Sequence, residues 1–345
     1  MSEESSVPQH RAVLVLPRIR VQNANAISSP MTWGFPAITA FTGLMTALER
    51  RLGREAGIAL LGVGVVCHGF EAQVTTSGYT RAFHLTRNPV QQDGSTAAIV
   101  EEGRVHLDLT LVFDALLTDE QRGEAERDAL AERIAHELAG MRLAGGSVLP
   151  ALPGVPSRAS RPMLALVPDD SQPDEQRKQF RRLARRWLPG FALVSRDDLL
   201  LRRLDEMRVD NPDASTLDAW LDLSRWNSRA VAPDETGDTA DAAKVEWIND
   251  PRPGWTVPIP VGFAALSVLH PPGSVAGARD MRTPFRFVES VWSMGQWISP
   301  HRLQGLSDLI WVPDHTPEPT DEHGLYRCIN GYRVSAPRSA EPSSN

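Results

Sequence analysis

Cysteine, lysine and long apolar runs are scarce in this sequence of 345 residues, and each shortage excludes a class of protein. The two cysteines, Cys67 and Cys328, lie far apart and form no CxxC pair, so we expect neither a disulfide framework nor a cysteine zinc site. No stretch reaches the roughly 18 consecutive apolar residues of a membrane span, and the first residues lack the apolar core of a signal peptide. These shortages predict a cytoplasmic protein with two inert thiols and no membrane partner.

Sequence motifs for cofactors, metals and nucleophilic catalysis are missing as well. Gly62 and Gly64 precede Cys67 where a dinucleotide fingerprint needs a third glycine, and no Walker sequence or G-x-S-x-G elbow occurs. The nine histidines are scattered along the chain without the local spacing of metal ligands, although folding could still gather them. We expect no cofactor and no bound metal.

The charge of the chain points in two directions. A formal net charge of −7 argues mildly against a nucleic-acid partner, because phosphate binding depends on clustered cations. The basic residues are nevertheless almost all arginine, with Lys178 and Lys244 as the only lysines, and the planar guanidinium fork suits phosphates and base edges. A GC-rich genome would produce the same bias and is the alternative explanation.

Hydrophobic patterning predicts an α+β domain at residues 12–168, with 41% hydrophobic residues in the whole chain to form a core. A strand at 12–22 carries Pro17, which we expect at an edge or a bulge because proline removes a ladder donor. Further strands are expected at 58–66, 70–74, 105–113 and 163–167. One helix spans the apolar repeat from Ile38 to Leu52 and stops at Gly53, and a second follows a capping box at Thr118–Gln121 and turns Leu130, Ile134, Leu138 and Met141 inward.

The resulting order is strand, helix, strand, strand, helix, strand. It is typical of ferredoxin-like and RNA-recognition-motif folds. A parallel doubly wound sheet is the alternative, but two consecutive strands without an intervening helix count against it.

The remaining segments differ in composition, and a polar hairpin-like insertion interrupts the domain at about 78–103. Residues 172–227 read as helical, and an acidic, proline-bearing connector follows. The predicted division is a disordered tail at 1–11, the domain at 12–168, a helical segment at 169–230, an acidic linker at 231–253, a β-rich unit at 254–333 and a disordered tail at 334–345.

Three stretches carry side chains that could recognise a ligand. The first, residues 18–35, is rich in amides and hydroxyls, which could instead only cap the helix near Pro36 and satisfy turn amides. The second is the turn after Arg142, where Gly145 and Gly146 permit close approach of a ligand, or simply connect a helix to a strand. The third is the helix at 177–187, which presents Arg181, Arg182, Arg185 and Arg186 opposite an apolar face and could contact phosphates or a partner, or be merely solvated.

Several longer strings carry a family resemblance. They are LPRIRVQNANAISSPMTWGFP, GVGVVCHGFEAQ, FHLTRNP, DGSTAAIVEEGR, MRLAGGSVLP, LPGFALVSR, SPHRLQGLSDL and GLYR, in one consistent order from Leu14 to Arg327. Together they resemble the Csy2-type subunit of the type I-F CRISPR surveillance complex, the Csy complex. The resemblance implies a RAMP-superfamily protein with an RNA-recognition-motif-like fold, structural rather than catalytic.

The same resemblance implies a function in antiviral DNA interference. The subunit would hold the 5′ handle of the CRISPR RNA, pair with the large subunit as a heterodimer, reach the adjacent backbone subunit through a thumb-like insertion, and meet target DNA through the assembled complex. Amides, arginines and aromatic rings are the groups that read single-stranded RNA. Within the matching motifs, this chemistry selects as RNA contacts Arg18, Arg20, Gln22, Asn23, Asn25, Ser28, Trp33, Arg87, Asn88, Arg142, Gly145, Gly146 and Ser147, with Ser28 and Ser29 steadying the loop.

The main alternative is a repeat-RNA endoribonuclease, because related members of the superfamily cut repeat RNA. Metal-free cleavage needs a general base and acid near the 2′-hydroxyl, and the histidines that could serve are His68, His84 and His301. A small-molecule enzyme with an α+β fold is a third interpretation, and no motif supports it.

Overall fold

A computed structural model describes eight stretches of the chain, which are residues 7–78, 80–87, 90–149, 160–231, 246–252, 254–278, 280–314 and 324–333. The predicted tail at 334–345 and most of the acidic linker lie outside the described residues.

The first half of the chain has the predicted order of elements, which is confirmed. Its elements are β1 (His10–Asn25), α1 (Ile38–Leu52), β4 (Ile58–Ala72), β9 (Arg104–Leu117), α2 (Glu124–Ala139) and β12 (Met163–Leu166). All pairings are antiparallel, and the strands lie side by side in the order β12, β1, β9, β4. The second and third strands of the motif are therefore direct neighbours, as two consecutive strands joined without a helix should be.

β1 is irregular at two places. Its pairing with β9 shifts register between Leu16 and Ile19, which confirms the expected bulge at Pro17, and shifts again between Val21 and Ala24. Within these bulges Arg18 and Asn23 have positive backbone φ angles of 56° and 57°. Bulges re-aim side chains, so both sites turn polar residues away from the regular ladder.

Some predicted boundaries are wrong. The Thr118–Gln121 capping box does not form: residues Asp119–Gln121 make a short 3-10 turn, α2 begins after Gly123, and Thr118 Oγ1 is buried without a hydrogen-bond partner among the described residues. The two strands expected at 58–66 and 70–74 are one strand, β4, with two bulges. β1 begins at His10, inside the tail predicted at 1–11.

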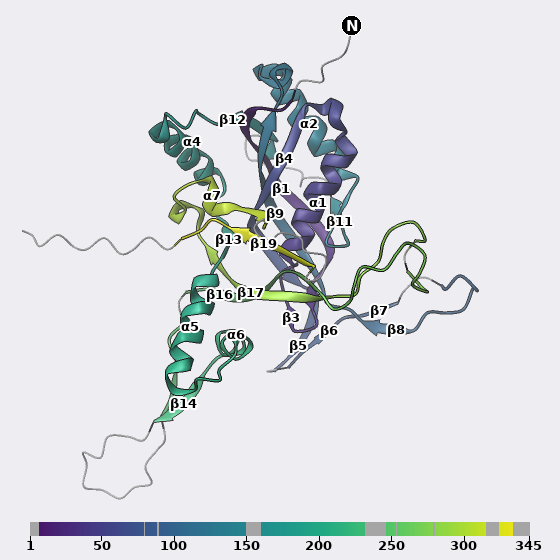
Figure 1. The fold of residues 1–345 in the computed structure, drawn as a ribbon, viewed down its shortest axis with the longest axis vertical. Helices are drawn as coiled ribbons and strands as arrows, with labels where there is room; N and C mark the ends of the chain where they lie inside the picture. Colours follow the sequence, from purple (N-terminus) through teal and green to yellow (C-terminus); the bar gives the residue numbers. More distant parts are fainter. Residues whose placement is uncertain are drawn as a thin grey trace, which may run out of the picture.

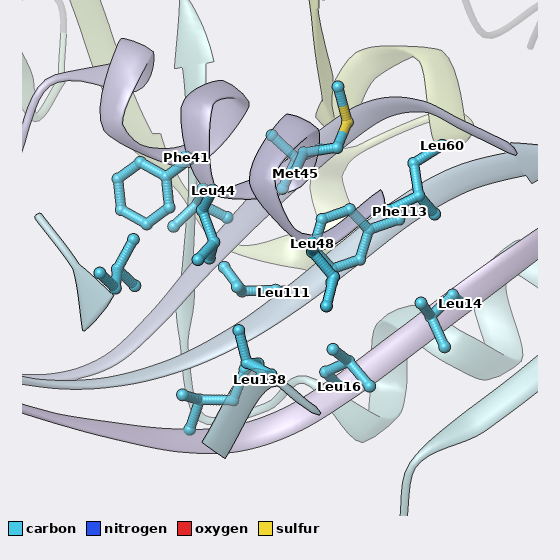
Figure 2. Close-up of a cluster of buried hydrophobic side chains, with 14 of the residues drawn as sticks. Leu14, Leu16, Phe41, Leu44, Met45, Leu48, Leu60, Leu111, Phe113 and Leu138 are labelled. Carbon is cyan, nitrogen blue, oxygen red and sulfur yellow. The ribbon is translucent and has the colours of Figure 1, made fainter. Parts of the chain in front are cut away.

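The largest core lies between the sheet and the two helices α1 and α2 (Figure 1). Side chains alternate along a strand, so Leu14 and Leu16 of β1 point to the same face as Leu111 and Phe113 of β9. Figure 2 shows this layer meeting Phe41, Leu44, Met45 and Leu48 of α1 and Leu138 of α2. Each such fully buried side chain contributes roughly 1.5 to 3 kcal/mol of hydrophobic stabilisation.

The opposite face of the sheet is covered only in part. Val13 and Val15 point to it. They pack against Phe180 and Leu183 of helix α4 (Pro173–Arg186) and against Trp187, which directly follows the helix. Further along the same face, beyond α4, the outward positions of β1 and β9 are polar. One end of this face is therefore a core, and the other end is an open polar surface.

The later strands join the same sheet instead of forming a sheet of their own. They are β13 (Phe191–Ser195), β16 (Thr256–Ala265), β17 (Val288–Ile298), β18 (Ile310–Pro313) and β19 (Leu325–Asn330). β13 and β18 both pair with β4, and between them the order β13, β17, β16, β19, β18 closes a ring of strands on β4. β13 falls within the segment predicted as helical, and its five residues are a strand because they pair with both β4 and β17.

A lobe of helices lies at one end of the molecule (Figure 1). It contains α5 (Asp197–Asp210), α6 (Thr216–Ser224) and the hairpin β14 (Ser228–Val231) with β15 (Glu246–Asn249). A true capping box opens α6: Ser215 Oγ accepts from the Asp218 backbone N–H, and the Asp218 carboxylate accepts from the Ser215 N–H. Residues predicted as linker thus contribute a strand to this lobe.

The insertion in the first domain consists of two hairpins. β5 (Val74–Ser77) pairs with β6 (Thr80–Phe83), and β7 (Leu85–Arg87) pairs with β8 (Ile99–Glu101). They project away from the main sheet (Figure 1), as expected for a hairpin-like insertion. Next to them lies the small hairpin β2 (Ile27–Ser29) with β3 (Thr32–Trp33).

Candidate RNA-binding surface

The fold brings together two polar segments that are far apart in the sequence. After α2 the chain forms the hairpin β10 (Arg142–Leu143) and β11 (Gly146–Leu149). β11 pairs with the second half of β1, where Gln22 lies opposite Ser147 and Arg20 lies opposite Leu149. The arginine and amides of β1 and the glycine turn after Arg142 therefore share one surface.

The turn of this hairpin needs its two glycines. Gly145 has a φ angle of 77°, a region that glycine adopts without steric cost, and it follows Ala144, whose φ is also positive at 48°. At Gly146 the backbone approaches β1 so closely that a Cβ would lie 2.7 Å from Gln22 O. Arg142 Nη1 donates to Gly145 O at 3.2 Å, and the Asn25 backbone N–H donates to Ala144 O at 2.8 Å. The glycine turn was expected to permit close approach of a ligand, and at Gly146 the chain that comes close is the backbone of β1.

Two adjacent hollows lie along this surface, with volumes of about 390 Å³ and about 330 Å³, and Gln22 lines both of them. We call them together the polar groove. The first is lined by Arg20, Val21, Gln22, Gly69, Phe70, Glu71, His106, Leu107, Asp108 and Leu149. The second is lined by Gln22, Asn23, Gln73, His84, Glu102, Arg104, Arg142, Gly145 and Ser147.

The charges of the polar groove are mixed. Arg18 at its edge pairs with Asp108 at 2.5 Å, and Arg104 pairs with Glu102 at 2.7 Å. The guanidinium group of Arg20 has no ion pair with any described residue. A groove with paired and unpaired arginines among amides suits directed hydrogen bonds better than uniform attraction of a phosphate chain.

The amides and hydroxyls of the predicted segment have different uses. The side chain of Asn25 stabilises a local turn, since its Nδ2 donates to Ile27 O at 2.8 Å and its Oδ1 accepts from the Ile27 N–H at 3.1 Å. Ser28 Oγ bonds to Thr32 Oγ1 at 2.8 Å and therefore steadies the β2–β3 hairpin. Asn23 differs: its backbone N–H donates to His106 Nδ1 at 3.1 Å, and its side chain is exposed in the groove without a hydrogen bond to any described residue.

The β2–β3 hairpin is anchored on two sides. Ser29 Oγ accepts from Trp292 Nε1 at 2.8 Å, which ties it to β17. Trp33 is 40% exposed and contacts Phe83 of β6 with ring centroids 5.9 Å apart. Trp33 therefore packs on the insertion and still presents part of its ring to solvent.

The other predicted contacts lie elsewhere. Arg87 belongs to β7, and Asn88 lies outside the described residues. The four arginines Arg181, Arg182, Arg185 and Arg186 are exposed on α4 and do not line the polar groove.

Sequence reasoning missed several residues of the groove. Glu71, Gln73, Arg104 and His106 line it, and none of them was predicted. The signal for His106 was present, because residues 105–113 alternate and place His106 and Asp108 together on the polar side of the strand. Which face of the sheet stays uncovered, however, depends on where α4 packs.

A chain of hydrogen bonds separates the polar groove from the covered end of the sheet. The Arg18 backbone N–H donates to Thr110 Oγ1 at 3.4 Å, and Thr110 Oγ1 lies 2.8 Å from His68 Nε2. His68 Nδ1 lies 2.7 Å from the carbonyl oxygen of Pro189, so Nδ1 carries the proton and Nε2 accepts from Thr110. Burial lowers the pKa of His68, with a smaller opposing effect of the bond to Pro189.

The three histidines of the nuclease alternative have different surroundings. Both ring nitrogens of His68 are hydrogen-bonded, His301 Nδ1 lies 2.8 Å from Ser299 Oγ, and His84 lines the polar groove. In the part of the chain that the structure describes, no three His, Cys, Asp or Glu side chains gather to hold a metal ion.

Burial raises the pKa of Cys67 to about 12, as an inert thiol requires. None of the described helices is both long and apolar enough to cross a membrane.

Two comparisons with known proteins agree with the resemblance in the sequence. The family model described as CRISPR-associated protein (Cas_Csy2) matches residues 14–328. The chain is also similar to the CRISPR-associated protein Csy2 of Pseudomonas aeruginosa (strain UCBPP-PA14), with 48% identity over 330 residues that cover 93% of this chain and 96% of that protein. The chain therefore belongs to the Csy2 family of CRISPR-associated proteins, the Csy complex subunits of type I-F systems.

Proposed function

We propose that this chain is a non-catalytic CRISPR RNA-binding subunit that holds the 5′ handle of the guide RNA in the polar groove. The observation that carries the proposal is the pairing of β11 with β1, which places Gln22 and Asn23 beside Arg142 and Ser147, and Arg20 opposite Leu149 in the adjoining hollow. These residues lie on the open end of a sheet face, and RNA-recognition-motif proteins use that part of their sheet to bind single strands.

The chemistry of the groove fits a splayed single strand. Free amides read the hydrogen-bonding edges of bases, an unpaired arginine can stack on a base or bind a phosphate, and the exposed part of Trp33 offers a surface for one base. Asn25, Ser28 and Gly146 act indirectly, because they hold the loop and the hairpin in place.

The family supports the partners we propose. They are the large subunit as a heterodimer partner, the adjacent backbone subunit, which the insertion would reach, and target DNA through the assembled complex, in the cytoplasm. The insertion carries exposed apolar side chains suited to a protein contact, since Leu85 is 68% exposed and Ile99 is 53% exposed. We propose a RAMP-type fold on the same basis.

The test compares the 5′ handle RNA with a scrambled RNA of equal length at one fixed salt concentration. The variant Arg20→Gln with Asn23→Gly removes a charge and an amide from the groove, and glycine keeps the positive φ of residue 23. We expect it to lose roughly tenfold in affinity for the handle, about 1.4 kcal/mol, and to lose little for the scrambled RNA.

The matched control is Arg50→Gln, which removes one positive charge from the exposed side of α1, away from the groove. It should bind the handle as the wild type does. If the groove variant weakens both RNAs equally, the groove supplies only charge and does not recognise the handle.

A further inference from the structure

Helix α4 has two contrasting sides. Phe180, Leu183 and Ala184 are buried against the sheet, whereas Arg181, Arg182, Arg185 and Arg186 are all exposed. Figure 1 shows α4 standing at one side of the sheet, far from β7 and β8. The arginines cover the arc of the helix that faces away from the core, and we call this arc the arginine face.

The charges of the arginine face are not balanced by the helix itself. Arg177 pairs with Asp174 at 3.5 Å and Lys178 pairs with Glu175 at 2.7 Å, so the two acidic residues of the helix are already used. No described residue forms an ion pair with Arg181 or Arg185. This is a strong local excess of positive charge on a chain whose net charge is −7.

Helix stability does not explain the arrangement. Arg181 and Arg185 are like charges at i and i+4, a spacing that costs a helix about 0.2 to 0.5 kcal/mol. The helix dipole does stabilise cations in the last turn, which accounts for Arg185 and Arg186. That effect fades beyond the last turn, so Arg181 and Arg182 need another reason.

The face offers charge without a surface for base stacking. The two aromatic rings of this segment, Phe180 and Trp187, are 5% and 1% exposed and contact each other edge to face in the core. Proteins that bind single strands combine cations with exposed aromatic rings, whereas the affinity of sequence-independent binding to a duplex comes almost entirely from cations at its phosphates. Successive arginines at i and i+4 rise about 6 Å along a convex helix, and this suits the outer phosphates of a duplex.

We propose that the arginine face of α4 binds the phosphate backbone of a DNA duplex without regard to sequence. This site is separate from the polar groove, because its arginines point away from the sheet and line neither hollow of the groove. It goes beyond the proposed handle function and does not depend on it.

The test uses the full chain and a labelled random-sequence DNA duplex of about 30 base pairs, with affinity measured over a range of salt concentrations. The variant Arg181→Gln with Arg185→Gln removes two charges and keeps good helix formers. Each lost phosphate contact should reduce the slope of log affinity against log salt by about 0.9, or about 1.8 for both. The control Arg177→Gln with Lys178→Gln removes the same charge from the same helix at positions already paired with acids.

Three results decide the proposal. A reduced slope in the arginine variant, an unchanged slope in the control and unchanged handle RNA binding in both would support a duplex site on this face. An unchanged slope in the arginine variant, or an equal loss in the control, would show that the face is solvated or meets a protein. If the arginine variant loses handle RNA binding together with duplex binding, these arginines lie on the RNA path and the proposal of a separate site is overturned. If the groove variant binds the handle as the wild type does, only the handle proposal is contradicted. The melting temperature of each variant is measured against that of the wild type, to check that the variant is folded.

Discussion

Gln22 of β1 lies directly opposite Ser147 of β11, and this cross-strand pair joins the two segments that form the polar groove. The pair exists because the chain returns after α2 to the free edge of β1 and because Gly146 lets the two backbones meet.

The two asparagines should separate recognition from stability. Asn23→Gly removes an exposed amide but keeps the backbone conformation, so handle binding should weaken by about 1 kcal/mol while the melting temperature hardly changes. Asn25→Ala removes two local hydrogen bonds and should lower the free energy of unfolding by about 1 kcal/mol. RNA titration and thermal unfolding of both variants make the comparison, and the reverse pattern would show that Asn23 is scaffolding.

Gly146→Ala should destabilise the protein by about 1 to 3 kcal/mol, because the new Cβ would press on the β1 backbone at Gln22 and Ala24, which cannot move aside like a side-chain end. Handle binding should weaken as well, since the hairpin must shift away from β1. The matched control is Gly43→Ala in α1, where no atom lies within 4 Å of the added Cβ. That change should raise stability by about 0.5 to 1 kcal/mol in denaturant unfolding, and similar losses in both variants would contradict the close approach at Gly146.

The stability of the protein should depend on the protonation of His68. Its pKa in the folded state lies below the usual 6.5, so the unfolded state takes up a proton first as the pH falls. The free energy of unfolding should therefore decrease as the pH drops below about 6.5, until the folded-state pKa is passed. His68→Gln removes this contribution, and the difference between wild type and variant, measured by denaturant unfolding across this range, isolates it. Parallel pH profiles for the two proteins would mean that His68 titrates alike in both states.

Purified protein should leave repeat RNA intact. The prediction follows from the proposed non-catalytic role, and His84 is the histidine of the alternative that lies in the polar groove. Incubation of end-labelled repeat RNA with the full chain, followed by gel separation, is the measurement. Specific cleavage that disappears in His84→Gln would establish the nuclease alternative instead.

Local patterns in the sequence predicted the local structure well. The apolar repeat from Ile38 to Leu52 produces α1, with Gly53 at its end at a φ of 74°, and Pro17 produces a bulge because its nitrogen has no proton to donate. The order of strands and helices in the first domain follows from such patterns, since helical and strand spacing are properties of neighbouring residues. The capping box shows the limit of these signals: Thr118 matches the pattern, but the chain there makes a 3-10 turn and α2 starts after Gly123.

The sequence by itself determined the family, the βαββαβ order and the amide-rich and arginine-rich segments from which the proposed sites are built. Only the tertiary structure decided which of these segments meet. FALVS at 191–195 is a strand because it pairs with β4 and β17. The side chain of Asn25 is bonded to Ile27, whereas that of Asn23 has no hydrogen bond to a described residue, because the hairpin and the loop surround the two asparagines differently. The physical reason is that pairing and burial join residues far apart in the chain, and no local pattern encodes which distant backbone will lie opposite Gln22.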